Sequence, residues 1–109
     1  MTLRAVPKPS RAVVSRPVRQ SARGQRCTLR LDGCLWGPET VVLCHIRGVW
    51  AGLSQKPNDF IAVYACHHCH DVLDRRRGER PDGWEVVRAL AETLTALSDQ
   101  GLLTLKGAR

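Results

Sequence analysis

The chain has 109 residues, of which 43% are hydrophobic and 25% are charged, and its formal net charge at pH 7 is +7. A chain of this length makes one domain at most, and so small a core usually needs a staple such as a metal ion or disulfide bonds. No apolar run is long enough for a signal peptide or a membrane-spanning helix, so we expect a cytoplasmic protein without a membrane partner.

All of the excess positive charge lies at the N-terminus. Residues 1–26 contain seven Lys or Arg residues and no acidic residue, whereas residues 27–109 contain ten basic and ten acidic residues. The prolines at positions 7, 9 and 17 oppose a packed amphipathic helix. We therefore predict an extended or disordered basic arm over 1–26 and a folded domain over 27–109.

A basic arm of this kind suits the phosphate backbone of a nucleic acid, because each neutralised phosphate releases counterions. Its candidate phosphate contacts are Arg16, Arg19 and Arg23. A solubilising or unstructured leader is the alternative interpretation of the same composition.

The first part of the folded domain predicts strands. "CTLRLDGC" (27–34) indicates a short strand that ends in an Asp32-Gly33 turn. "ETVVLCHI" (39–46) and "FIAVYA" (60–65) are rich in β-branched and aromatic residues, and we predict a strand in each. Residues 47–59, between these two strands, contain several turn formers and predict a loop.

The second part of the domain predicts helices. We expect one helix from about His67 to Arg77, with Gly78 as its stop. A second helix follows, with Asp82 as a possible N-cap and Gly101 at its end. Apolar residues recur along it at three- and four-residue spacing. These residues are Trp84, Val87, Leu90, Ala91, Leu94 and Leu97. The closing "LLTL" predicts a short strand or a tail.

The five cysteines predict a zinc site, because an odd number of reduced cysteines argues against a disulfide framework. Cys66-x2-Cys69 is a tight turn that can direct two thiolates at one ion, and Cys27 and Cys34 complete a four-sulfur set. The alternative is that some of them are small buried apolar residues. We prefer that interpretation for Cys44, in the middle of a strand.

A second metal site is predicted by His70 and Asp74, which lie one helical turn apart on one face of the predicted helix. An imidazole and a carboxylate can hold a divalent cation for phosphodiester hydrolysis, and His45 can activate the attacking water. Surface histidines with an ordinary helix carboxylate are the alternative. We expect His67 and His68 to face solvent as bystanders.

These residues resemble a known family. Cys-x2-Cys followed directly by His, after a strand that ends near His45, resembles the HNH (ββα-metal, His-Me finger) endonucleases. In more detail, "ETVVLCHIRG", "QKPNDFIAVYACHHCHDVLD" and "GWEVVRALAETLTALSDQGLL" resemble the small YbcO-like prophage nucleases over roughly residues 27–105.

The resemblance implies an α+β fold, a small zinc-stapled ββα-metal domain with an appended C-terminal helix. It implies that His45 is the general base and that His70 is a ligand of a catalytic Mg2+ or another divalent cation. The cysteines at 27, 34, 66 and 69 would then hold a separate structural Zn2+.

Two positions differ from the family's pattern. Many HNH enzymes have an acidic or histidine metal ligand just before the base, where this chain has Cys44. The middle Asn of the HNH pattern is represented by Asn58 and Asp59, which lie farther from the cysteine pair than usual. We take Asp59 as the catalytic candidate, since a carboxylate can bind the metal or orient the His45 loop.

The function that we predict is a divalent-metal-dependent DNA endonuclease in phage or prophage DNA processing or recombination, with little sequence specificity. Arg47 is a candidate clamp for the scissile phosphate, and Arg75, Arg76 and Arg77 are either phosphate contacts or a solvated helix end. The alternative is a non-catalytic zinc module that binds nucleic acid. A protein-interaction zinc domain in a phage complex is a third interpretation.

Overall fold

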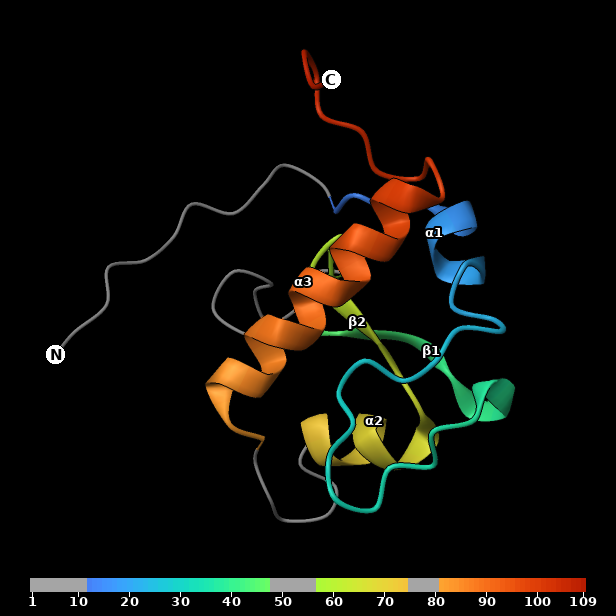
Figure 1. Ribbon diagram of the computed structural model, residues 1–109, viewed down its shortest axis with the longest axis vertical. Helices are drawn as coiled ribbons and strands as arrows, with labels where there is room; N and C mark the ends of the chain where they lie inside the picture. The colour runs from blue at the N-terminus through green and yellow to red at the C-terminus, as the bar shows by residue number, and fades with distance from the viewer. Residues whose placement is uncertain (1–11, 48–56, 75–80) are drawn as a thin grey trace, which may run out of the picture.

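The computed structural model describes residues 12–47, 57–74 and 81–109 (Figure 1). The elements follow in the order α1 (Arg16–Gln20), a 3-10 turn (Pro38–Thr40), β1 (Val42–His45), β2 (Ala62–Ala65), α2 (His67–Leu73) and α3 (Gly83–Asp99). The described parts thus make a small α+β domain with one two-stranded sheet and three α-helices, which confirms the α+β class. None of these helices is long and apolar enough to cross a membrane.

The sheet is an antiparallel pair, so both predicted strands are confirmed, although each is shorter than expected. The register places Leu43 opposite Tyr64, Cys44 opposite Val63 and His45 opposite Ala62. Opposed residues share a face, and side chains alternate along a strand. Cys44 and His45 therefore begin on opposite faces of the sheet.

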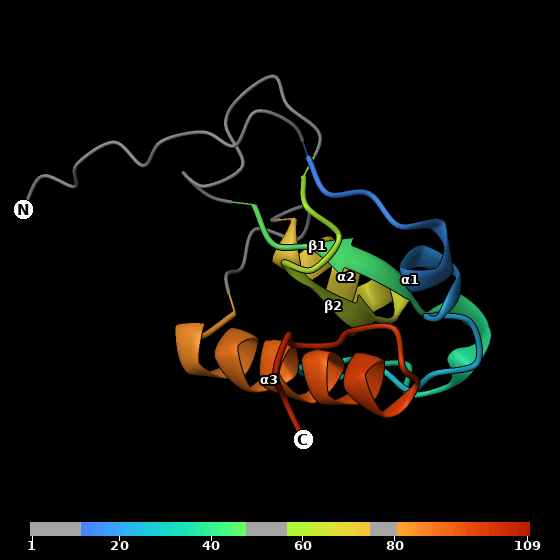
Figure 2. The ribbon, with the colours of Figure 1, turned by 90° about the horizontal axis from the view of Figure 1, so that it is seen from above.

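The helices surround this sheet. Figure 2 shows α3 running along one side of the strands, while α1 lies beside β1 and α2 follows directly from β2. The Tyr64 hydroxyl connects two of these helices, because it lies 2.7 Å from Ser21 Oγ after α1 and 3.2 Å from Gln100 Nε2 at the end of α3.

Helix α3 begins and ends where the sequence predicts. The Asp82 side chain accepts a hydrogen bond from the Trp84 N–H, as an N-cap does. At the other end, Gly101 has φ of 75°, and the Leu102 N–H donates to the Leu97 carbonyl at 2.8 Å. This is a Schellman ending, which needs a left-handed residue at the glycine position.

The buried face of α3 is rotated from the predicted stripe. Leu90, Leu94 and Leu97 pack against the core, but Trp84 is 78% exposed and Val87 is 52% exposed. Ala91 is also exposed, whereas Ala89 and Thr93 are fully buried. The prediction was wrong for Trp84, Val87 and Ala91. The spacing of apolar residues alone placed the buried face wrongly, because the polar residue Thr93 lies at its centre.

Thr93 is buried because it completes the hydrogen bonding at the outer edge of β2. Its Oγ1 accepts the Tyr64 N–H at 3.1 Å, and the Thr28 hydroxyl donates to the Tyr64 carbonyl at 2.9 Å. The two hydroxyl oxygens lie 3.2 Å apart, so the Thr93 hydroxyl donates to the Thr28 hydroxyl. Each donor in this series of three hydrogen bonds therefore has an acceptor. The Thr28 N–H also donates to the Tyr64 carbonyl at 2.8 Å, so this strand edge is covered by Thr28 and Thr93 instead of a third strand.

Hydrogen bonds and one ion pair attach α3 to the segment before the sheet. Arg88 donates to the carbonyls of Thr28 and Leu29 at 2.7 and 2.8 Å, and Arg30 makes a two-bond pair with Glu92, both bonds 2.7 Å. The donors on Arg30, and to a smaller extent on Arg88, lower the pKa of Glu92 to about 2 despite its partial burial.

The N-terminal segment differs from the prediction. Residues 12–26 are folded onto the domain, and α1 begins at an Ser15 N-cap whose Oγ accepts the Val18 N–H. The prediction was wrong here because Pro17 falls in the first turn, where proline is tolerated, and because Val18 and Ala22 bury one face. Residues 1–11 of the predicted arm lie outside the described residues.

Three other predictions can be compared with the structure. The Asp32-Gly33 turn is present, with Gly33 at φ 87°, but residues 27–31 form no strand. Helix α2 matches the first part of the predicted helix, and residues 75–78 lie outside the described residues, as does most of the 47–59 loop. The final "LLTL" is a tail without a strand.

Replacing Thr93 with valine should lower the free energy of unfolding by about 1–3 kcal/mol, because the buried Tyr64 N–H loses its acceptor while the side-chain volume is kept. Thr95→Val is the matched control, since its hydroxyl only bonds back to the Ala91 carbonyl on the exposed face. It should cost less than about 0.5 kcal/mol. Urea unfolding followed by tryptophan fluorescence measures both, and equal losses would contradict this account of the β2 edge.

Candidate functional site

Four cysteine sulfurs form one cluster. Sγ atoms of Cys27, Cys34, Cys66 and Cys69 all lie within 4.8 Å of one another. The first two come from the irregular segment before the sheet, and the last two from the N-cap and first turn of α2. Zn–S bonds of about 2.3 Å in tetrahedral geometry place sulfurs roughly 3.8 Å apart. The separation of Cys34 Sγ and Cys66 Sγ is 3.8 Å, so the donor set fits zinc in both chemistry and spacing.

The backbone around this cluster donates hydrogen bonds to sulfur. The Leu35 N–H points at Cys66 Sγ and the Trp36 N–H at Cys34 Sγ, each at 3.4 Å. Trp36 has φ of 60° and Arg30 has φ of 50°, so each of the first two cysteines is followed within three residues by a left-handed turn. Such turns direct main-chain N–H groups inward, which stabilises thiolates.

The thiols share their protons unequally. A hydrogen bond from Cys69 lowers the pKa of Cys27 to about 4, and the same bond raises the pKa of Cys69. Burial raises the pKa of Cys34 to about 11. A cation at the centre of the cluster would favour four thiolates together.

His68 holds this cluster from outside. Its Nε2 lies 2.7 Å from the Asp32 carbonyl, and a Cβ added to Gly33 would come within 2.5 Å of the same nitrogen. The glycine therefore allows the turn to approach α2 closely, and His68 is partly exposed with a bond to that turn. His67 is 65% exposed, with its Nε2 at 3.6 Å from Asp71 Oδ2.

A second group combines Cys44, His70 and Asp74, whose ligand atoms also lie within 4.8 Å of one another. His70 Nε2 and Asp74 Oδ2 are 3.1 Å apart across one turn of α2, as their spacing predicts. Cys44 joins them from β1, although the sequence favoured a purely apolar role for it. The signal that the prediction undervalued is its position directly before His45.

His45 pairs with Asp59 on the other side of the sheet. Its Nε2 lies 2.8 Å from Asp59 Oδ1, and the Asp59 side chain is only 2% exposed. Asp59 also accepts from Arg19 Nε, at 3.0 and 2.9 Å to its two oxygens, and from the Ser15 N–H at 2.6 Å. Burial opposes ionisation of Asp59, but these donors outweigh it and lower the pKa of the carboxyl below its ordinary value.

Asp59 was predicted either to bind the metal or to orient the His45 loop, and its contacts bear on this choice. Among the described residues, Asp59 contacts His45, Arg19 and Ser15 and is not a member of either candidate metal group. This geometry favours orientation of His45 over metal ligation. Asn58 has a separate bond, in which its Oδ1 accepts the Val13 N–H at 2.7 Å.

The candidate phosphate contacts are distributed along the surface. Arg16, Arg23 and Arg47 are exposed, and Arg19 is 44% exposed although its Nε is bonded to Asp59. The candidates Arg75, Arg76 and Arg77 lie outside the described residues.

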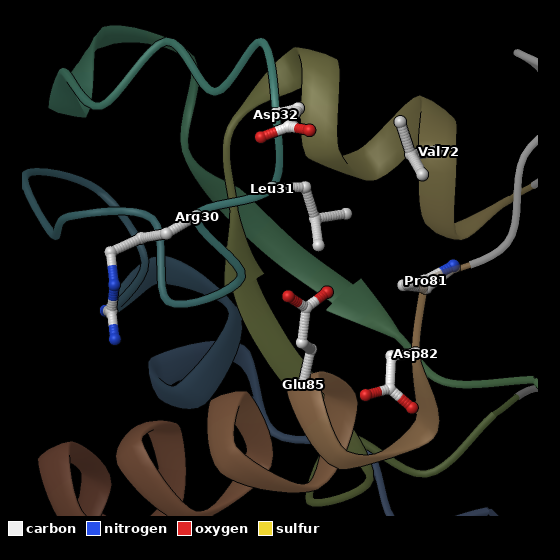
Figure 3. Close-up of a pocket in the computed structure, with 7 residues that line it drawn as sticks. All are labelled: Arg30, Leu31, Asp32, Val72, Pro81, Asp82 and Glu85. Atoms are coloured by element: carbon white, nitrogen blue, oxygen red, sulfur yellow. The ribbon is translucent and has the colours of Figure 1, made fainter.

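A separate hollow of about 180 Å³ lies between the cysteine-bearing segment, α2 and the start of α3 (Figure 3). Its lining includes the carboxylates of Asp32, Asp82 and Glu85 beside the single cation of Arg30. This negative lining disfavours a phosphate. The hollow contains none of the predicted catalytic residues.

The chain is similar to several known proteins. A family model described as "Putative nuclease YbcO" matches residues 16–98. "Putative nuclease YbcO" of Escherichia coli (strain K12) and "Putative nuclease ybcO" of Enterobacteria phage 82 are each 50% identical to the chain over 62 residues. That match covers 54% of this chain and 64% of each relative, so the chain spans less than two thirds of their length.

A solved structure is also similar. It is described as "Structure of a putative bacteriophage protein from Escherichia coli str. K-12 substr. MG1655", with 37% sequence identity and a TM-score of 0.62. The alignment covers 78% of this chain and all of that one.

The two groups of potential ligands are separate, so substitutions in one group should not release zinc from the other. After treatment with a chelator, elemental analysis should find one tightly held zinc per chain in the wild type and in His70→Ala. Cys69→Ser should lose that zinc and much of its folded structure, because metal-binding energy contributes to folding. Loss of the zinc from His70→Ala would mean that the two groups are assigned wrongly.

Proposed function

The chain belongs to the family described as "Putative nuclease YbcO", and from that premise we propose that it is an HNH-type, divalent-metal-dependent DNA endonuclease. The observation that carries the proposal is the arrangement around two consecutive residues of β1. Cys44 joins a mixed group of potential metal ligands, and His45 joins a buried carboxylate. The two residues are consecutive at the end of β1, so the candidate metal group and the candidate base lie at the same end of this strand, with side chains that start on opposite faces of the sheet.

His45 is the proposed general base. The ionised Asp59 accepts the Nε2–H, which fixes the tautomer and leaves a lone pair on Nδ1. That nitrogen can take a proton from water as the water attacks phosphorus. Asp59 also stabilises the imidazolium that results, since its carboxylate is already in contact with the ring.

The Cys44–His70–Asp74 group is the proposed site of the catalytic cation. A divalent cation held there would polarise the phosphate and stabilise the leaving oxygen. The donor set bears on the choice of ion, because a thiolate and an imidazole favour Zn2+ or a similar transition metal over Mg2+. Mg2+ was expected from His70 and Asp74 alone, and the thiol of Cys44 changes that preference.

The proposed substrate is the DNA backbone. Arg47 follows His45 by two residues and is exposed, so it is suited to contact the phosphate beside the base. Arg16 and Arg23 would extend that contact without reading sequence, and the role of Arg75, Arg76 and Arg77 remains a prediction. Relatives named for a bacteriophage support a link to a phage or prophage, and we propose that the chain acts there in DNA processing or recombination, in the cytoplasm.

Nicking of supercoiled plasmid tests the proposed mechanism. With Zn2+, Mn2+ or Mg2+ supplied in turn, His45→Ala should reduce the rate by about 100-fold or more, which is the usual contribution of a general base. His67→Ala is the matched control, because it removes a histidine of α2 that is 65% exposed and should change little. Unchanged cleavage by His45→Ala would remove this mechanism, and DNA binding without cleavage under any metal would favour the non-catalytic module.

Cys44→Asp tests the identity of the cation. Exchange of a thiolate for a carboxylate should weaken Zn2+ binding at this group by about tenfold or more, since even indirect partners of a metal are worth that much. Mg2+ and Mn2+ should then support a larger share of the nicking activity. The zinc of the four-cysteine cluster should be retained, and an unchanged metal preference would place Cys44 outside the catalytic site.

A further inference from the structure

We propose that Arg19 is a positioning residue for the His45–Asp59 pair, so that the N-terminal segment completes the general-base site. This inference rests on the proposed function, because it concerns how the base of that reaction is held. Arg19 lies 40 residues from Asp59 in the sequence, which predicted it only as a phosphate contact.

The first observation is the way in which residues 13–19, the N-terminal strap, dock on the Asn58–Asp59 turn. The Val13 N–H donates to Asn58 Oδ1, and the Asp59 N–H donates to the Val13 carbonyl at 2.9 Å. The Ser15 N–H then donates to Asp59 Oδ2. Three bonds thus place the strap beside the carboxylate before the Arg19 side chain is considered, and Figure 2 shows α1 next to β1.

The second observation is the geometry at the carboxylate. Arg19 Nε lies 2.9–3.0 Å from both oxygens of Asp59, while His45 Nε2 uses one of them and Ser15 uses the other. Both oxygens are therefore fixed, and the plane of the carboxylate cannot turn without breaking a bond to Arg19. Since the position of Asp59 Oδ1 sets the direction of the imidazole, Arg19 sets it indirectly.

The third observation is the charge. Asp59 is nearly fully buried, and a buried carboxylate without a partner is strongly unfavourable. Among the described residues, Arg19 is the cation in contact with Asp59. Arg19 therefore balances the buried charge of Asp59.

A kinetic double-mutant cycle tests this role. Arg19→Met should lower kcat for plasmid nicking about tenfold, with KM changed less than about threefold, because orientation of the base is lost and phosphate contact is not. Arg19→Lys should restore part of kcat by returning the positive charge. In Asp59→Asn, the further change Arg19→Met should have almost no effect on kcat, since Arg19 acts through the missing carboxylate.

Two neighbours on α1 serve as comparisons. Gln20→Met changes an exposed side chain of the same helix and should leave kcat and KM unchanged. Arg16→Met should raise KM at low salt, as loss of a phosphate contact does. An Arg19→Met variant that only raises KM, like Arg16→Met, would overturn the proposal, as would effects of Arg19→Met and Asp59→Asn that add on a logarithmic scale.

Two further measurements distinguish a loss of folding in Arg19→Met, and a failure of the proposed function, from a failure of the role of Arg19. If Arg19→Met fails to fold, the test uses Arg19→Lys and the double variant Arg19→Met with Asp59→Asn. The double variant does not bury an unpaired charge, so it should be more stable than Arg19→Met alone. His45→Ala is measured beside them. Cleavage unaffected by His45→Ala would contradict the proposed function itself, whereas loss in His45→Ala with no kcat effect in Arg19→Met or Arg19→Lys would contradict only the role of Arg19.

Discussion

The contact among four cysteine sulfurs determines where the other parts of this small domain can lie. It joins residues 27–34, which form no strand, to the N-terminal turn of α2, more than thirty residues later. The turn there has Gly33 at φ 87°, a conformation that favours glycine, and it lies against the His68 ring. Because the sulfurs hold the first turn of α2, they also set the direction in which His70 and Asp74 project.

The same contact gives α3 a surface to pack on. Arg88 and Glu92 bind the 28–30 segment, and Thr93 reaches the outer edge of β2 beside Thr28. A two-stranded sheet alone is marginal, since one edge of each strand is open. In this domain the irregular segment and a helix cover one of those edges, and the segment owes its shape to the sulfur cluster.

Much of the candidate site could be predicted from local spacing. The Cys66-x2-Cys69 turn and the His70–Asp74 pair depend only on the geometry of one helix, and both are present in the structure. Contacts that depend on register or on distant segments were not predictable in this way. Cys44 needed the pairing of β1 and β2 to place its thiol beside α2. Arg19 and Asp59 needed the N-terminal segment to fold back, against a composition that favours disorder.

The central claim is that "ACHHCHDVLD" (65–74) serves two cations, one held by Cys66 and Cys69 and the other by His70 and Asp74. Anomalous diffraction at the zinc edge, from crystals grown with excess Zn2+, tests it most directly. The account predicts two peaks, one within the four sulfurs and one bounded by Cys44 Sγ, His70 and Asp74. A single peak shared by ligands of both groups, or a second peak bound directly by Asp59, would contradict it.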